Sequence, residues 1–169
     1  DSLFPGKTAV VVADKITYEI AGKTIHGYLE DAGINTDQPF VFTDPGLYAE
    51  WSYLEQLESY LKERDVIAVA VGLGVINDLT KLASYHLGRR YIIVGMAASM
   101  DGYTSYGASV TYHGNKQTFD CPAPLGMVMD PAVAAKAPAG ITASGYGDLI
   151  AKIPSGADWM IADAVGSES

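Results

Sequence analysis

Short runs of β-branched residues alternate with longer amphipathic segments through the first two thirds of the chain, and this alternation constrains the fold most. The short runs have the length and residue types of buried strands, and the longer segments have the spacing of helices that pack on a sheet. Strands joined by crossover helices form a parallel sheet with helices on both faces. The pattern predicts an α/β domain with strands at 8–13, 40–43, 66–71 and 91–94 and helices at 17–32, 47–63 and 75–87.

The pattern changes after Gly95. Residues 105–112 and 116–120 flank Gly114-Asn115, which predicts a β-hairpin added to the α/β domain, and the apolar run 125–129 is expected to return to the main sheet. From residue 131 the chain is rich in Ala and Gly, and Pro138 and Pro154 predict helices separated by breaks. We therefore expect an α/β domain at 1–130 and the beginning of a helical domain at 131–169.

Composition excludes several classes of protein. The chain has 49% hydrophobic and 18% charged residues, as folded globular proteins do, and its net charge of -9 argues against binding nucleic acid or an anionic membrane. The longest apolar stretch, 66–76, is too short to span a bilayer. A single cysteine, Cys121, excludes an internal disulfide framework, so we expect a cytoplasmic protein.

A glycine-containing turn joins the strand predicted at 66–71 to the next helix. Its sequence is Gly72-Leu73-Gly74-Val75-Ile76-Asn77-Asp78-Leu79-Thr80-Lys81. Glycines allow the backbone to approach a diphosphate closely, and free N–H groups at a helix start favour its negative charge. Asn77 stands where the dinucleotide fingerprint has its third glycine, so a tight turn without a ligand is the alternative interpretation.

Two polar segments follow. Ser99, Asp101 and Ser105 lie in a loop after the strand predicted at 91–94, and ligands of open α/β sheets bind at the carboxyl ends of strands. In the alternative interpretation, Asp101-Gly102 makes a turn that the serines cap. Further along, Asp148 and Lys152 stand in a small, apolar setting. Asp148 is either a metal ligand that needs partners or a carboxylate near a helix start.

Taken in order, four motifs resemble one superfamily. They are Val11-Val12-Ala13-Asp14, the segment Gly72–Lys81, Ser99-Met100-Asp101-Gly102 and Gly145-Tyr146-Gly147-Asp148. They resemble the iron-containing alcohol dehydrogenases, glycerol dehydrogenases and dehydroquinate synthases, and within these the sn-glycerol-1-phosphate dehydrogenase family. The resemblance implies a Rossmann-like domain, an all-helical domain and a cofactor in the cleft between them.

The resemblance also implies roles for individual residues. Asp101 would contact substrate, and Asp148 matches the first metal ligand, whose histidine partners we expect to lie beyond the end of this chain. Leu73 and Met96 replace a usual Gly and Thr, which bears on cofactor affinity or orientation. The implied cofactor contacts are Asp14, Gly72, Gly74, Val75, Ile76, Asn77, Asp78, Ser99 and Ser105.

The activity implied by the resemblance is hydride transfer between NAD or NADP and a small polyol phosphate, interconverting dihydroxyacetone phosphate and sn-glycerol 1-phosphate. A divalent zinc, nickel or iron ion would polarise the carbonyl oxygen, and a homodimer is a family-level expectation. We expect the isolated chain to be inactive. Two alternatives stay open: a dehydroquinate synthase-like enzyme, and an inactive fragment that binds a nucleotide.

Overall fold

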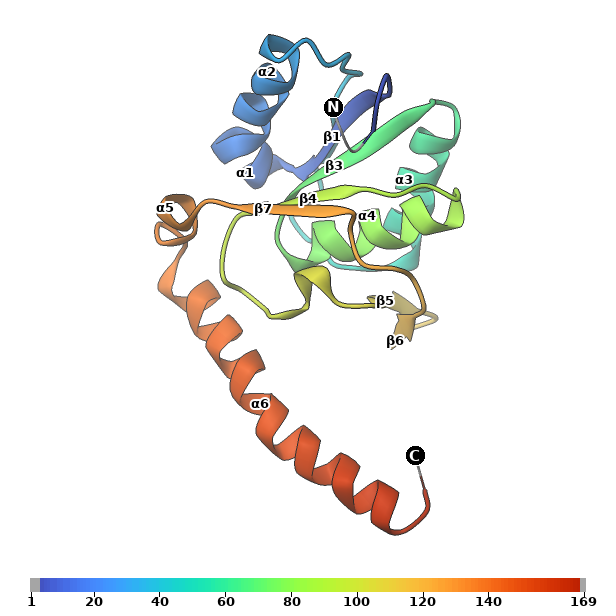
Figure 1. Ribbon diagram of the computed structural model, residues 1–169, viewed down its shortest axis with the longest axis vertical. Coiled ribbons are helices and arrows are strands. Elements are labelled where there is room, and N and C mark those ends of the chain that lie inside the picture. The colour runs from blue at the N-terminus through green and yellow to red at the C-terminus, as the bar shows by residue number, and fades with distance from the viewer. Residues whose placement is uncertain (1–3, 168–169) are drawn as a thin grey trace.

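A five-stranded parallel sheet lies at the centre of the computed structural model, which describes residues 4–167 (Figure 1). The strand order is β2-β1-β3-β4-β7. This confirms the predicted α/β class, and the strand after the hairpin does return to the main sheet. The strands are β1 (Thr8–Asp14), β2 (Phe40–Phe42), β3 (Val66–Gly72), β4 (Ile92–Gly95) and β7 (Gly126–Met129).

Helices cover both faces of the sheet (Figure 1). On one face, Val10 and Val12 of β1 belong to the apolar core formed with α3 (Trp51–Lys62) and α4 (Gly74–His86). On the other, Val11 and Ala13 belong to the core that meets the helical segment α1 (Lys15–Thr17), η1 (Tyr18–Gly22) and α2 (Lys23–Asp31). Alternate side chains of a strand point to opposite faces, so one buried strand supplies both cores.

The predicted hairpin is present, with a small shift in its turn. It consists of β5 (Ala108–Tyr112) and β6 (Asn115–Phe119), and Tyr112 pairs with Asn115. The turn residues are therefore His113-Gly114 rather than Gly114-Asn115, and both have positive φ, as two-residue hairpin turns require. The Trp51 ring packs 4.5 Å from that of Tyr112, between centroids, and attaches the hairpin to α3.

After β7 the chain forms α5 (Pro131–Ala134) and α6 (Ala139–Ala164), which extends away from the sheet (Figure 1). The predicted break at Pro138 is confirmed, because α6 begins just after it. The predicted break at Pro154 is wrong, since α6 continues through it. Because this helix is exposed, the carbonyl group that proline leaves without a donor is accessible to solvent. The domain division at 130 stays a prediction, and 1–3 and 168–169 lie outside the described residues.

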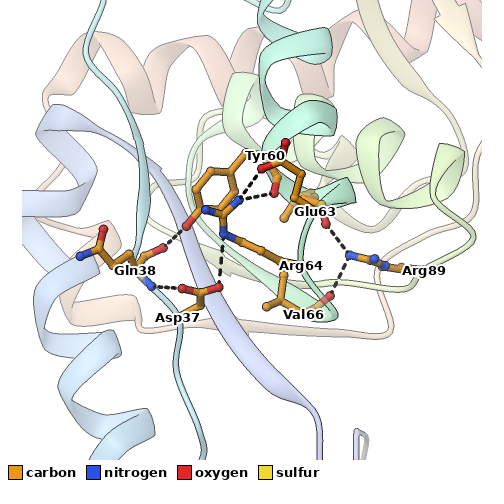
Figure 2. Close-up of polar contacts among 8 residues, drawn as sticks. Asp37, Gln38, Tyr60, Glu63, Arg64, Val66 and Arg89 are labelled. Atoms are coloured by element: carbon orange, nitrogen blue, oxygen red, sulfur yellow. Dashed lines mark hydrogen bonds and ion pairs between the residues drawn. The ribbon is translucent and has the colours of Figure 1, made fainter.

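A network of polar contacts lies at the end of the sheet where β3 begins (Figure 2). The Arg64 guanidinium stacks 3.8 Å from the Tyr60 ring centroid, donates to the Tyr60 carbonyl oxygen at 2.9 Å and pairs with Asp37 at 3.3 Å. Arg89 donates to backbone carbonyl groups at the end of α3 and the start of β3. These contacts tie the segment before β2, the end of α3 and the start of β3 together.

Candidate functional site

A cavity of about 810 Å³ lies at the carboxyl ends of the strands. Its walls come from the segments that follow β1, β2, β3 and β4, and from the α5–α6 region. A volume of this size suits a small-molecule ligand or cofactor. A cavity therefore lies at the end of the sheet where open parallel sheets bind ligands. The glycine turn contributes Leu73, Val75 and Ile76 to its lining, whereas Ser99, Asp101 and Ser105 of the polar loop are not among its lining residues.

The glycine turn forms one wall of this cavity. β3 ends at Gly72 and α4 begins at Gly74, while Leu73, Val75 and Ile76 line the cavity. Leu73 is the N-cap of α4 and provides no side-chain hydrogen bond. The first N–H groups of α4 are therefore available to an anion, which the helix dipole also favours.

A side chain would crowd a neighbour at both glycines of this turn, more severely at Gly72 than at Gly74. A Cβ at Gly72 would lie 2.8 Å from the Ile76 Cβ, and one at Gly74 would lie 3.0 Å from the Met100 Sδ. Both distances are closer than ordinary van der Waals contact, so a side chain at either position would displace its neighbour. The turn can approach a diphosphate because it carries no side chain where the helix begins.

The next two predicted cofactor residues, Asn77 and Asp78, contact other parts of the fold rather than the cavity. Asn77 is fully buried, accepts from the Tyr91 hydroxyl at 2.8 Å and donates to the Tyr103 carbonyl oxygen at 3.3 Å. Asp78 accepts from the Ser109 N–H at 3.4 Å. Burial raises the pKa of the Asp78 carboxyl to about 6, although nearby Lys81 opposes the shift. Neither side chain lines the cavity.

Asp14 combines a structural contact with a place at the cavity. Its carboxylate caps α1 by accepting from the N–H groups of Ile16 and Thr17, each at 2.8 Å, and the residue also lines the cavity. Asp44, in the segment after β2, lies on the same wall. The sequence did not single out Asp44, because only the pairing of β2 beside β1 brings the two segments together.

The loop after β4 is closed by its own hydrogen bonds. The Ser99 hydroxyl lies 3.0 Å from the Tyr103 hydroxyl, which donates to the Ala97 carbonyl oxygen at 2.8 Å. The Ser105 hydroxyl donates to the Gly102 carbonyl oxygen at 2.8 Å across the short helix η2 (Gly102–Thr104). These bonds match the turn interpretation. The cofactor contacts predicted for Ser99 and Ser105 stay predictions.

The structure brings the predicted catalytic residues Asp101 and Asp148 together. The Asp101 N–H donates to the Asp148 carboxylate at 3.0 Å, and the Lys152 ammonium lies 3.3 Å from Asp101 and 3.4 Å from Asp148. The Asp101 backbone donor is the largest cause that holds the pKa of the Asp148 carboxyl below its usual value, and Lys152 adds to the effect. α6 can approach the loop this closely because residue 145 is a glycine. A Cβ at this position would overlap the Ala98 carbonyl group.

This cluster does not fit a divalent metal ion by itself. Within residues 4–167, no three His, Cys, Asp or Glu side chains gather where they could hold a metal. Two carboxylates that share an ammonium group provide too few ligands, and the ammonium repels a cation. The metal-binding role of Asp148 therefore stays a prediction. In the same described range, no helix has both the length and the apolar composition needed to cross a membrane.

Lys81 is a polar residue of this region to which the sequence interpretation assigned no role. It is 1% exposed, and its ammonium donates to the carbonyl oxygens of Ser105 at 2.9 Å and Gly107 at 3.0 Å. Burial lowers the pKa of the Lys81 ammonium, and Asp78 opposes that shift. The available signal was its spacing of three residues from Asp78, which places both on one side of α4.

Comparison with known families and curated proteins shows what the chain is similar to. A family model described as iron-containing alcohol dehydrogenase matches residues 2–138. The chain is 37% identical over 162 residues to the glycerol-1-phosphate dehydrogenase, NAD(P)+, of Halalkalibacterium halodurans, covering 94% of this chain and 40% of that protein. The Methanosarcina mazei protein of the same name is 34% identical over 160 residues, covering 95% and 44%. The chain thus spans less than half the length of these relatives.

A solved structure agrees in fold. A probable glycerol dehydrogenase from Sinorhizobium meliloti superposes with a TM-score of 0.71 at 27% identity. The match covers 85% of this chain and 38% of that structure. The sheet and its helices therefore follow an architecture already seen in a larger protein.

Proposed function

Because this chain belongs to the iron-containing alcohol dehydrogenase family, we propose that it is the cofactor-binding part of an NAD(P)-dependent dehydrogenase. The proposed reaction interconverts dihydroxyacetone phosphate and sn-glycerol 1-phosphate, the chemistry that the names of its relatives suggest. One observation carries this proposal: α4 begins without a side-chain cap, between two glycines, at the wall of a cavity of about 810 Å³.

The segments that line the cavity follow four different strands, and the proposed dinucleotide would span them. The adenosine half would lie toward Asp14 and Asp44, where a carboxylate favours a ribose hydroxyl over a phosphate. The N–H groups at the start of α4 would hold the diphosphate, and the nicotinamide half would then extend toward Met96 and Ala97 after β4. When bound, the nicotinamide would supply or accept the hydride, and the chain would position it.

Asp101 and Asp148 are the proposed polar contacts of the substrate half of the site. Their carboxylates can accept hydrogen bonds from polyol hydroxyl groups, and Lys152 lies within 3.4 Å of both, a cation able to attract a phosphate. We also propose that Asp148 is one ligand of a divalent ion. Because the described residues do not complete such a site, no chemical step is assigned to that ion.

The test uses protein expressed from the natural reading frame. NADH oxidation is followed by absorbance with dihydroxyacetone phosphate and an added divalent ion, and NADH binding is measured by calorimetry. We expect oxidation, and we expect Gly74→Val to weaken NADH binding roughly tenfold or more, since a side chain there crowds Met100 and the start of α4, where the diphosphate would bind. Gly140→Val is the matched control, because a Cβ there would meet nothing within 4 Å.

Each failure has a distinct meaning. If the natural protein does not bind NADH, the proposed function is wrong. If it binds NADH but shows no net oxidation, the dehydroquinate synthase-like alternative gains support, because that chemistry regenerates its cofactor within each turnover.

A further inference from the structure

The buried ammonium group of Lys81 has no part in the proposed hydride transfer. It is 1% exposed, and its two hydrogen bonds go to the backbone carbonyl groups of Ser105 and Gly107. Burying an ammonium group is costly unless hydrogen bonds replace its water. A neutral apolar side chain would fill the same space without that cost, so the hydrogen bonds themselves need an explanation.

Two other side chains of α4, those of Asn77 and Asp78, form hydrogen bonds with the same segment, residues 103–109. Asn77 donates to the Tyr103 carbonyl oxygen at 3.3 Å, and Asp78 accepts from the Ser109 N–H at 3.4 Å. With Lys81, three side chains of α4 hold residues 103–109 through backbone groups alone. Beside the loop's own side-chain hydrogen bonds, α4 therefore holds the backbone of that segment in place.

The start of α4 and the loop that α4 holds belong to different halves of the proposed site. α4 begins at Gly74, where the diphosphate would bind. The segment it holds continues the loop after β4, in which the Tyr103 hydroxyl donates to the Ala97 carbonyl oxygen at 2.8 Å, and Ala97 lines the cavity. The Lys81 contacts thus connect the diphosphate turn to the wall that the nicotinamide half would reach.

We propose that Lys81 is a positioning residue that fixes the loop at 99–107 relative to the start of α4. The wall at Met96 and Ala97, which the nicotinamide half of the dinucleotide would contact, is then already in place before the cofactor binds. This proposal rests on the proposed function. The proposal predicts different effects on two ligands. ADP would occupy only the adenosine and diphosphate regions, whereas NADH would also contact the wall that the loop supports. Small displacements of such walls weaken binding and catalysis strongly.

The test compares binding of NADH and of ADP by calorimetry at a temperature well below unfolding. The proteins are the natural one, Lys81→Met, Lys81→Arg and the control Lys62→Met, which alters an exposed lysine at the end of α3. We expect Lys81→Met to raise the Kd of NADH roughly tenfold and to change that of ADP less than about twofold, because two charge-assisted hydrogen bonds are lost. Lys81→Arg, which keeps donors and charge, should bind NADH more tightly than Lys81→Met.

A second measurement follows the loop directly. Amide hydrogen exchange in Lys81→Met should become faster at 103–109 while β1 and β3 keep their protection, and Lys62→Met should leave both unchanged. If Lys81→Met does not fold, Lys81→Gln, which keeps an amide donor, replaces it under the same criteria.

The positioning role is wrong if Lys81→Met binds NADH as the natural protein does, or if NADH and ADP weaken by the same factor. It is also wrong if exchange at 103–109 is unchanged. Failure of the natural protein to bind NADH would overturn the proposed function as well, which distinguishes the two failures.

Discussion

At the scale of single residues, Asp78 is held in an environment that disfavours its charge. Burial is the largest cause, and it raises the pKa of the carboxyl from 3.8 to about 6. A carboxyl whose pKa is higher in the folded state than in the unfolded state favours folding most when it is protonated. Its contribution is therefore fully present below pH 3.8 and is lost as pH rises through about 6.

We accordingly expect Asp78→Asn to stabilise the fold at neutral pH. The amide is neutral and can still accept from the Ser109 N–H. The substitution should therefore increase the free energy of unfolding by about 2 kcal/mol more at pH 7.5 than at pH 4. Urea unfolding at the two pH values measures this difference. Asp31→Asn, at an exposed position, is the control. An equal effect of Asp78→Asn at both pH values would contradict the expectation.

At the scale of elements, α6 shows how far a helix can tolerate a proline. It contains 26 residues with Pro154 inside, and large apolar side chains such as Ile153 and Met160 are each 76% exposed. Pro154 has no N–H to donate to the carbonyl group four residues earlier, and its ring crowds that group. The helix is therefore locally weakened, although the structure shows it unbroken.

We expect Pro154→Ala to stabilise α6 by up to about 3 kcal/mol, because alanine restores the missing hydrogen bond and removes the clash. Slower amide hydrogen exchange at 150–158 and a stronger helical circular dichroism signal would show this. Pro131→Ala is the control, since Pro131 is at the first position of α5, where its ring fits and no N–H is needed. Similar effects of the two changes would argue against a strained helix at Pro154.

At the scale of the whole molecule, one cavity depends on segments from distant parts of the sequence. Its lining includes Asp14 after β1, Asp44 after β2, Ile76 in α4 and Ile141 in α6. A ligand that bridges these segments adds contacts that the unfolded chain cannot make. The proposed cofactor should therefore stabilise the sheet and the region after β7 together.

NADH at a hundred times its Kd should add about 2.7 kcal/mol to the free energy of unfolding, by mass action on the folded state. Thermal unfolding at increasing NADH concentrations checks this, with a midpoint that rises steadily. In Gly74→Val the rise should be much smaller at the same concentrations, since the anion site is disturbed. An equal rise in both proteins would place NADH away from the start of α4.

The sequence by itself determined the elements and much of their order. Runs such as Val10–Ala13 and Val66–Val71 identify buried strands, and Gly33 and Gly88, both with positive φ, follow the ends of helices, where glycine is favoured. The glycine turn at 72–74 was also predictable, because a strand, a tight turn and a helix start are specified by neighbouring residues. These signals are local, so no knowledge of distant contacts was needed.

Only the tertiary structure decided what the polar residues contact. Asn77 and Lys81 lie in an apparently ordinary helix, and their partners at Tyr103, Ser105 and Gly107 lie 24 or 26 residues further along the chain. Asp44 faces the cavity because β2 pairs with β1, and Asp101 meets Asp148 because α6 packs on the loop after β4. Local sequence determines backbone conformation, whereas hydrogen-bond partners depend on which distant surfaces pack together, and that is settled only when the whole chain folds.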